Sequence, residues 1–237
     1  MASIKVKAIV IGGTNVKEKD RQVRLFTLEN GKMQVSMKGV RGEKAKMKAA
    51  KELFCFGEYI IEQTSTSNIV TGVDIIDNFF EISKDIDKYY EACAMLDVVD
   101  KVSTSQANPQ LFLQILKALK TICYENVKKY YCIDKFMLNI FAAMGYKFMT
   151  DVCSSCGGRL AKRFFNFEYG EIVCTACKND LCDEIFDACY SALRLFENTT
   201  YEKLSTLHIG GMGEMQAFSL LAKNFNWRTG FKMIDIP

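Results

Sequence analysis

Cys153-Ser154-Ser155-Cys156 and Cys174-Thr175-Ala176-Cys177 are the two stretches that organise the second half of this chain. Seventeen residues separate these C-x-x-C pairs, a spacing typical of a four-cysteine structural zinc site. Two cysteines three positions apart can reach one ion from a tight turn, and Gly157-Gly158 gives that turn its backbone freedom. Four thiolates leave no position for water, so the ion is expected to be structural. We therefore predict one Zn²⁺ bound by Cys153, Cys156, Cys174 and Cys177.

Two other interpretations of these cysteines remain open. One is a redox dithiol, which would need a C-x-x-C pair on a thioredoxin-like βαβ pattern that this sequence lacks. The other is a set of unrelated core cysteines. Cys182 is a possible substitute ligand, although Cys182 and Cys189 fall on an apolar helical stripe typical of small core residues.

The composition is that of a soluble globular protein with a substantial core. The chain has 237 residues, of which 49% are hydrophobic and 25% charged, enough for one large domain or two modest ones. It contains no run of eighteen apolar residues and no signal-peptide pattern, so we expect a cytoplasmic protein without membrane contact. In that compartment the ten cysteines are better explained by reduced thiols and one metal site than by disulfides.

The charge is unevenly distributed along the chain. Residues 1–57 contain 13 Lys and Arg against 5 Asp and Glu, a net charge of +8. The whole chain carries +3, so the remainder carries −5. This asymmetry indicates an anionic partner for the N-terminal part.

The N-terminal part has the pattern of a small β barrel. Apolar-rich or alternating segments predict five strands, and a short helix is expected between the third and fourth. Asn30-Gly31 favours a two-residue type I′ hairpin turn, and Met33, Val35 and Met37 alternate with polar residues along the third strand. The strands are expected at residues 4–11, 22–29, 32–38, 54–61 and 69–76, and the helix at 43–52. This order predicts a five-stranded OB-type barrel.

The rest of the chain reads as helical. An acidic amphipathic segment spans residues 79–102, and Asn108 is a good N-cap with Pro109 at the first helical position of the next helix. A third helix is expected to stop at Gly145. Further expected elements are a hairpin at 163–173, an apolar helical stripe at 182–196 and a last helix at 213–224. The predicted class is α+β: a barrel in residues 1–78, then a helical domain in 79–237 with an inserted zinc ribbon at 150–180.

A basic cluster is the strongest indication of function. Six cations fall within residues 38–51, opposed only by Glu43, and helical phase would place Lys44, Lys48 and Lys51 on one face. Cations on one helix face beside a barrel would form a positively charged groove, which suits a phosphate backbone. The alternative is a solvated lysine-rich helix without a binding role. The predicted nucleic-acid contacts are Arg21, Arg24, Lys32, Lys38, Arg41, Lys44, Lys46, Lys48 and Lys51. Candidate base-stacking rings, each more typical of a core than of a stacking surface, are Phe26, Phe54, Phe56 and Tyr59.

Catalytic motifs are poorly represented. His208 is the only histidine, so an arrangement that needs two histidines cannot form. The sequence has neither a G-x-x-x-x-G-K-[ST] phosphate loop nor the H-x-E motif of zinc deaminases. We therefore predict a protein that is not an enzyme and has no small-molecule substrate.

Several short motifs follow one another along the chain. They are Lys38-Gly39-Val40-Arg41, Tyr90-Glu91-Ala92-Cys93-Ala94-Met95-Leu96-Asp97, Asn108-Pro109-Gln110-Leu111-Phe112, and Phe136-Met137-Leu138 leading through Met144-Gly145-Tyr146 into Cys153. In this order and spacing they resemble the bacterial RecO family of recombination mediators along nearly the whole chain. The resemblance implies an OB barrel followed by a helical domain with a zinc ribbon.

The resemblance also implies a set of partners. It implies binding to single- and double-stranded DNA, annealing of complementary strands, and loading of a RecA-type recombinase onto strands covered by single-strand-binding protein. RecR is the implied protein partner, the location is the cytoplasm in association with the nucleoid, and the cationic stretch from Lys38 to Lys51 maps to a DNA-contacting region. A zinc-ribbon RNA-binding or transcription accessory factor is the alternative.

Overall fold

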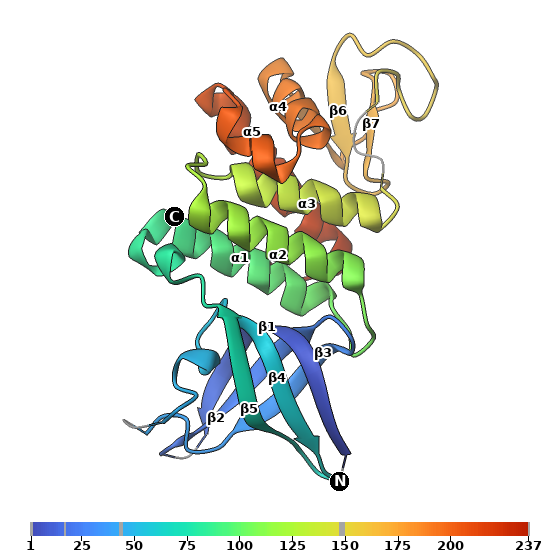
Figure 1. Cartoon of the computed structure of the whole chain (residues 1–237). Helices are drawn as coiled ribbons and strands as arrows, with labels where there is room; N and C mark the ends of the chain where they lie inside the picture. The colour runs from blue at the N-terminus through green and yellow to red at the C-terminus, as the bar shows by residue number, and fades with distance from the viewer. Residues whose placement is uncertain (1, 17, 43–44, 147–149, 237) are drawn as a thin grey trace. The chain divides into compact units, whose positions relative to one another are not determined.

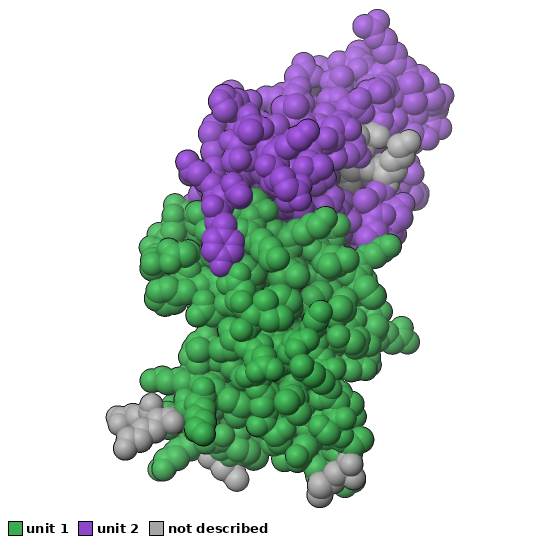
Figure 2. Space-filling view, in the orientation of Figure 1, with its two compact units in different colours: residues 1–123 green, residues 124–237 purple. Residues whose placement is uncertain are grey.

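The computed structural model describes residues 2–16, 18–42, 45–146 and 150–236. Backbone contacts divide the chain into two compact units, Met1–Cys123 and Tyr124–Pro237 (Figure 2). Within the described ranges, none of the helices combines the length and the apolar character needed to cross a membrane.

The first unit is built on a closed five-stranded barrel with strand order β1-β2-β3-β5-β4 (Figure 1). β1 forms antiparallel pairs with both β2 and β4. A bulge between Val10 and Gly12 bends the strand, so that it can pair with β2 and β4 along different parts of its length. The barrel closes through a parallel pairing of β3 with β5 at Ser36 and Ile69. The strands are β1 (Ala2–Val16), β2 (Asp20–Thr27), β3 (Gly31–Met37), β4 (Phe56–Gln63) and β5 (Asn68–Asp77). The predicted OB-type barrel is confirmed.

Two local predictions in the barrel are wrong. β1 does not stop at Gly12-Gly13 but continues to Val16, because both glycines still pair with β2. The first hairpin has a three-residue turn, since Thr27 pairs with Gly31. Gly31 has a positive φ of 63° but Asn30 does not, which excludes the predicted type I′ turn.

The barrel core follows the alternation of the strands. Val35 and Met37 are buried in it, and Met33 packs against the same cluster, as the sequence predicts. The Tyr59 hydroxyl is also buried and donates a 2.9 Å hydrogen bond to the carbonyl of Ala50. This bond ties the segment between β3 and β4 to the barrel interior.

That segment is not the helix predicted at residues 43–52. The described part is a series of i to i+3 turns that contains only the short 3₁₀ helix η1 (Ala49–Lys51). Ala50 belongs to the barrel core and Met47 packs against it. The apolar side chains are therefore anchored as expected, but the lysines between them do not share an α-helical face.

Two helices complete the first unit. After the 3₁₀ helix η2 (Phe80–Lys84), α1 (Ile86–Val102) is capped by the side chain of Asp85. α2 (Pro109–Tyr124) begins as predicted, with the Leu111 amide donating to the Asn108 side chain at 3.0 Å. Phe112 of α2 lies 5.8 Å from the ring of Phe26, a contact that joins helix and barrel. The predicted boundary after residue 78 follows the change from strands to helices and stays a prediction.

The second unit combines three helices with a small antiparallel sheet of order β7-β6-β8 (Figure 1). Tyr131 of α3 packs edge-on against Phe196 of α4 at 5.1 Å. Gly213 lets α5 approach α4, because a Cβ there would lie 2.8 Å from the carbonyl oxygen of Ala188. The elements are α3 (Tyr131–Ala143), β6 (Arg163–Asn166), β7 (Glu171–Val173), β8 (Cys182–Ile185), α4 (Asp187–Asn198), the 3₁₀ helix η3 (Tyr201–Thr206) and α5 (Gly211–Thr229).

The helical stripe predicted from residue 182 begins too early. Cys182 and Ile185 lie on β8, which pairs with β6, and α4 starts only at Asp187. These residues form a third strand because they pair with the free edge of β6. The periodicity of a local segment cannot predict pairing with a distant strand. The predicted hairpin is present, and α5 is longer at both ends than the predicted 213–224.

Candidate nucleic-acid interface and metal centre

The four predicted cysteine ligands come together. The Sγ atoms of Cys153, Cys156, Cys174 and Cys177 all lie within 4.8 Å of one another, and Cys156 and Cys174 are 3.9 Å apart. Zinc–sulfur bonds of about 2.3 Å in a tetrahedron separate the sulfur atoms by roughly 3.8 Å. The cluster is therefore the right size to hold a metal ion.

Backbone groups shape the first cysteine turn. The Cys153 amide donates to the Gly158 carbonyl and the Gly157 amide donates to the Cys153 carbonyl, both at 2.8 Å. Gly157 adopts a φ of 70°, a conformation that glycine reaches without steric cost. This turn directs the amide groups of the segment toward sulfur.

The electrostatics of the cluster favour a cation. Burial raises the pKa of the Cys153 thiol, but backbone N–H groups of Cys174, Cys156 and Ser155 outweigh it and lower that pKa to about 6. The hydrogen bonds from Cys156 and Cys174 raise the pKa of Cys177 to about 12. A second thiolate is therefore unfavourable without a positive ion, and a divalent metal would supply that charge.

Cys182 is not part of the cluster. The four-sulfur group found among the described residues excludes it, and its thiol instead donates to the Asn179 side chain at 3.2 Å. It is half-buried on β8, so it is neither a substitute ligand in this arrangement nor a residue of a helical stripe.

The predicted cations separate into groups. The cations of the first group form ion pairs with an acidic residue of α1. Arg24 Nε lies 3.1 Å from one carboxylate oxygen of Asp100, and Lys32 Nζ lies 3.3 Å from the other. Lys32 also donates to the Asp100 carbonyl. Since one carboxylate holds both side chains against the barrel, these cations are already partly compensated.

A second group is compensated locally. Lys38 forms an ion pair with Asp20 at 3.4 Å. Lys51 is buried and its ammonium contacts the neighbouring Glu52 carboxylate, so it does not lie on an exposed face as the helical phase predicted. Lys44 lies outside the described residues.

The remaining predicted cations are Arg21, Arg41, Lys46 and Lys48. Arg41 and the two lysines are exposed, and Arg21 is half-buried on β2. Arg21 and Lys48 line a pocket of about 660 Å³. The other lining residues are Ala49, Glu52, Leu53, Phe54, Asn78, Phe79, Phe80, Ser83 and Tyr89.

The aromatic rings proposed from the sequence are core residues. Phe26, Phe54, Phe56 and Tyr59 are all buried, and none presents a ring to solvent. Phe80 is 60% exposed and lies at the edge of the pocket with Arg21 and Lys48. Sequence reasoning missed it because a single phenylalanine after a strand has no periodic signal. The one indication in the sequence was the adjacent pair Phe79-Phe80, of which the structure buries the first ring and exposes the second.

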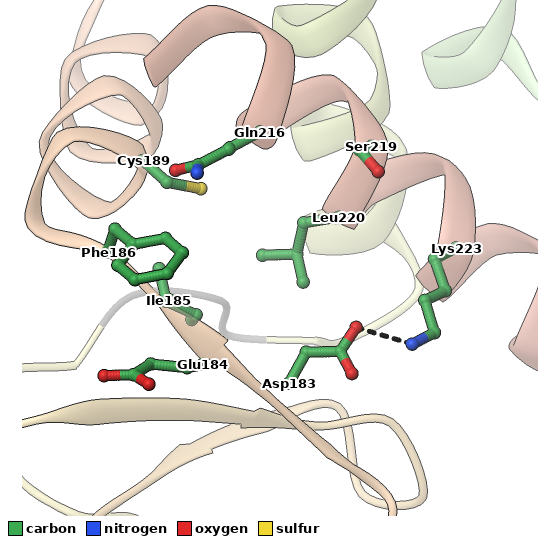
Figure 3. Close-up of a pocket in the computed structure, with 9 residues that line it drawn as sticks. All are labelled: Asp183, Glu184, Ile185, Phe186, Cys189, Gln216, Ser219, Leu220 and Lys223. Atoms are coloured by element: carbon green, nitrogen blue, oxygen red, sulfur yellow. Dashed lines mark hydrogen bonds and ion pairs between the residues drawn. The ribbon is translucent and has the colours of Figure 1, made fainter. Parts of the chain in front are cut away.

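The second unit contains a smaller pocket of about 150 Å³ between β8, α4 and α5 (Figure 3). Its walls include Leu220 and Phe186, and Asp183 forms an ion pair with Lys223 at 2.5 Å. Glu184 adds a second carboxylate. Two acids against one base make this pocket a poor site for a phosphate backbone.

Known proteins match nearly the whole chain. A family model described as Recombination protein O N terminal matches residues 1–79, and one described as Recombination protein O C terminal matches residues 83–230. The DNA repair protein RecO of Thermoanaerobacter sp. is 26% identical over 215 residues, 90% of this chain and 87% of that protein. The DNA repair protein RecO of Clostridium novyi is 25% identical over 223 residues, 93% of this chain and 87% of that protein.

Proposed function

The chain belongs to the Recombination protein O family of DNA repair proteins, and from that premise we propose that it is a non-enzymatic recombination mediator. It binds single- and double-stranded DNA and anneals complementary strands. It helps to load a RecA-type recombinase onto strands covered by single-strand-binding protein, with RecR as partner. We place it in the cytoplasm, associated with the nucleoid.

One observation carries the DNA-binding part of this proposal. Arg21, Lys46 and Lys48 form no ion pair with any residue in the described part of the chain, and Arg21 and Lys48 line the same pocket beside the barrel. Cations without a carboxylate partner can release counterions from DNA when they bind its phosphates. Neutralising phosphates also lowers the repulsion between two strands, so annealing needs no covalent step.

We propose Zn²⁺ as the ion of the cysteine cluster. Four sulfur ligands without histidine or carboxylate suit a soft or borderline metal, and the 3.9 Å between the sulfurs of Cys156 and Cys174 is close to the separation in a four-sulfur zinc site. Such an ion has no open position, so its role would be to hold together the short strands of the ribbon. DNA is favoured over the RNA of the alternative hypothesis because the relatives named above are DNA repair proteins.

A salt titration of DNA binding tests this function. Arg21, Lys46 and Lys48 are replaced together by alanine, and affinity for a single-stranded oligonucleotide is measured across a range of salt concentrations. We expect weaker binding and a slope of log affinity against log salt that is shallower by about 0.7 for each lost contact.

The control removes the same charge from the second unit by replacing Lys162, Lys203 and Lys232, which are exposed. This variant should bind DNA with the wild-type slope. If the barrel variant kept the wild-type slope, or if the control lost as much, the barrel cations would not be the DNA contacts.

A further inference from the structure

We propose that the pocket beside the barrel receives one unstacked base of single-stranded DNA together with an adjoining phosphate. The pocket is the one lined by Arg21, Lys48 and Phe80. This inference rests on the proposed DNA-binding function and adds a specific element to it. The pocket would let the barrel distinguish single-stranded from double-stranded DNA, in addition to attracting the negative charge of both.

The size and the walls of the pocket suit a planar ligand. Its volume of about 660 Å³ falls within the range of small-molecule sites, roughly 300–1,000 Å³. The half-buried Leu53 and Tyr89 provide apolar and aromatic wall, together with Phe54 and Phe79, whose side chains are almost fully buried. A base that leaves its stack loses contact with its neighbours, and such walls replace that contact.

Phe80 is the exposed ring of this site. It is 60% exposed, although phenylalanine is usually buried. Its backbone is held in place, since its amide donates to the Asn78 side chain at 3.2 Å and its carbonyl accepts from the Ser83 hydroxyl at 2.7 Å. An exposed ring on a fixed backbone is a suitable stacking surface for any base.

The backbone around the pocket is unusual in a second respect. Phe54 and Phe79 adopt φ values of 72° and 48°, in the left-handed region that non-glycine residues rarely occupy. Both line the pocket, and both rings are buried. The backbone of Phe54 is fixed by its amide, which donates a hydrogen bond to the Val10 carbonyl at 3.1 Å. The amide of Phe79 donates a hydrogen bond to the Asp77 side-chain carboxylate at 2.9 Å. Strained backbone of this kind concentrates at binding sites.

The charges at the pocket fit a base that is still attached to its strand. Arg21 and Lys48 supply two cations that could contact phosphate oxygens. The carboxylate of Glu52, which also lines the pocket, is paired with the ammonium of Lys51. Lys84 lies 5.3 Å from the centre of the Phe80 ring, although it also pairs with Glu81. Asn78 and Ser83, which hold the Phe80 backbone, are uncharged polar residues of the lining. Since a duplex keeps its bases stacked and paired, only a single strand could use ring and cations together.

Replacement of Phe80 by alanine in the full chain tests the inference. Binding is measured by fluorescence anisotropy with a labelled oligothymidylate, with the same strand carrying abasic positions, and with a duplex of equal length. Phe80→Ala should weaken binding to the intact single strand by about 5- to 100-fold and leave duplex binding unchanged. The abasic strand should bind wild-type and Phe80→Ala proteins equally weakly. Phe80→Tyr, which keeps a ring, should bind like the wild type.

Phe186→Ala is the matched control, because Phe186 is a phenylalanine of similar exposure, 56%, in the second unit. It should bind all three DNAs like the wild type. A strand containing 2-aminopurine gives an independent reading on the unmodified protein, since stacking in the pocket should quench the base fluorescence. Thymidine monophosphate should not displace the strand at comparable concentrations.

The possible outcomes distinguish a failure of the base pocket from a failure of the proposed DNA binding. Wild-type affinity of Phe80→Ala for the single strand, equal losses on single strand and duplex, or unquenched 2-aminopurine would each overturn the base pocket while leaving DNA binding intact. Ready displacement by the mononucleotide would overturn it in favour of a free-nucleotide site. If the wild-type protein bound neither form of DNA, both proposals would fall.

Discussion

Gly31 shows how one residue joins the barrel to the segment between α1 and α2. It has a φ of 63°, and a Cβ at this position would lie 2.5 Å from the carbonyl oxygen of Thr104. The next amide, that of Lys32, donates to the same carbonyl at 2.7 Å. The close approach of two backbones leaves no room for a side chain.

We expect Gly31→Ala to lower the free energy of unfolding by about 2–4 kcal/mol, because it combines left-handed strain with a backbone clash. Gly39 is the matched control: it has the same φ of 63° but nothing within 4 Å of its missing Cβ. Gly39→Ala should lower stability by only about 1 kcal/mol. Urea denaturation measures both, and equal losses would show that strain alone matters at Gly31.

At the scale of elements, the ribbon carries the four-cysteine cluster and has little regular structure of its own. Its three strands contain only three or four residues each, too few to form a stable sheet alone. Cations stack on its aromatic rings, as Lys178 does on Phe164 at 4.6 Å. Longer-range contacts join the ribbon to α5, as Lys223 does over the Phe167 ring at 4.4 Å, and we expect an ion between the two cysteine turns to add the stability that such short strands lack.

We predict that Cys156→Ser, or removal of metal by a chelator, abolishes stoichiometric zinc binding and exposes the ribbon to proteolysis. Cys182→Ser is the control and should retain one zinc per chain, because Cys182 lies outside the four-sulfur cluster. Elemental analysis of protein purified under reducing conditions measures the metal. Zinc loss in Cys182→Ser equal to that in Cys156→Ser would contradict the assigned ligand set.

At the scale of the whole molecule, the net charge of the N-terminal part overstates the number of cations that are left without an acidic partner. Residues 1–57 carry +8, but part of this charge is compensated inside the first unit. Asp100 of α1 holds Arg24 and Lys32 of the barrel, and Asp20 holds Lys38. The acidic helix that follows the barrel therefore lowers the positive potential at the surface of the barrel.

Asp100→Asn should release Arg24 and Lys32 and so raise DNA affinity, with a salt slope steeper by about 0.7 for each cation that becomes a contact. Asp97→Asn makes the same charge change on the same helix, where Asp97 pairs with Lys101 at 2.6 Å, and should change the slope less. Filter binding at several salt concentrations compares the two. Equal slopes would mean that Asp100 does not restrain the barrel cations.

Much of the molecule was determined by sequence alone. The alternation of Met33, Val35 and Met37, the Asn108 cap and the two C-x-x-C pairs are local patterns, and the structure confirms what each predicts about fold or proximity. They succeed because strand pleat, helix capping and metal chelation each involve residues a few positions apart.

Only the tertiary structure decided which cations stay available and where an aromatic ring is exposed. Lys32 and Asp100 are 68 positions apart, and the pocket joins Arg21 to residues as distant as Tyr89. Periodicity reports which face of an element is buried, but not which distant charge or backbone it meets there. Pairing across the fold depends on closure of the barrel and packing of the helices against it, and that arrangement separated cations that are neighbours in the sequence.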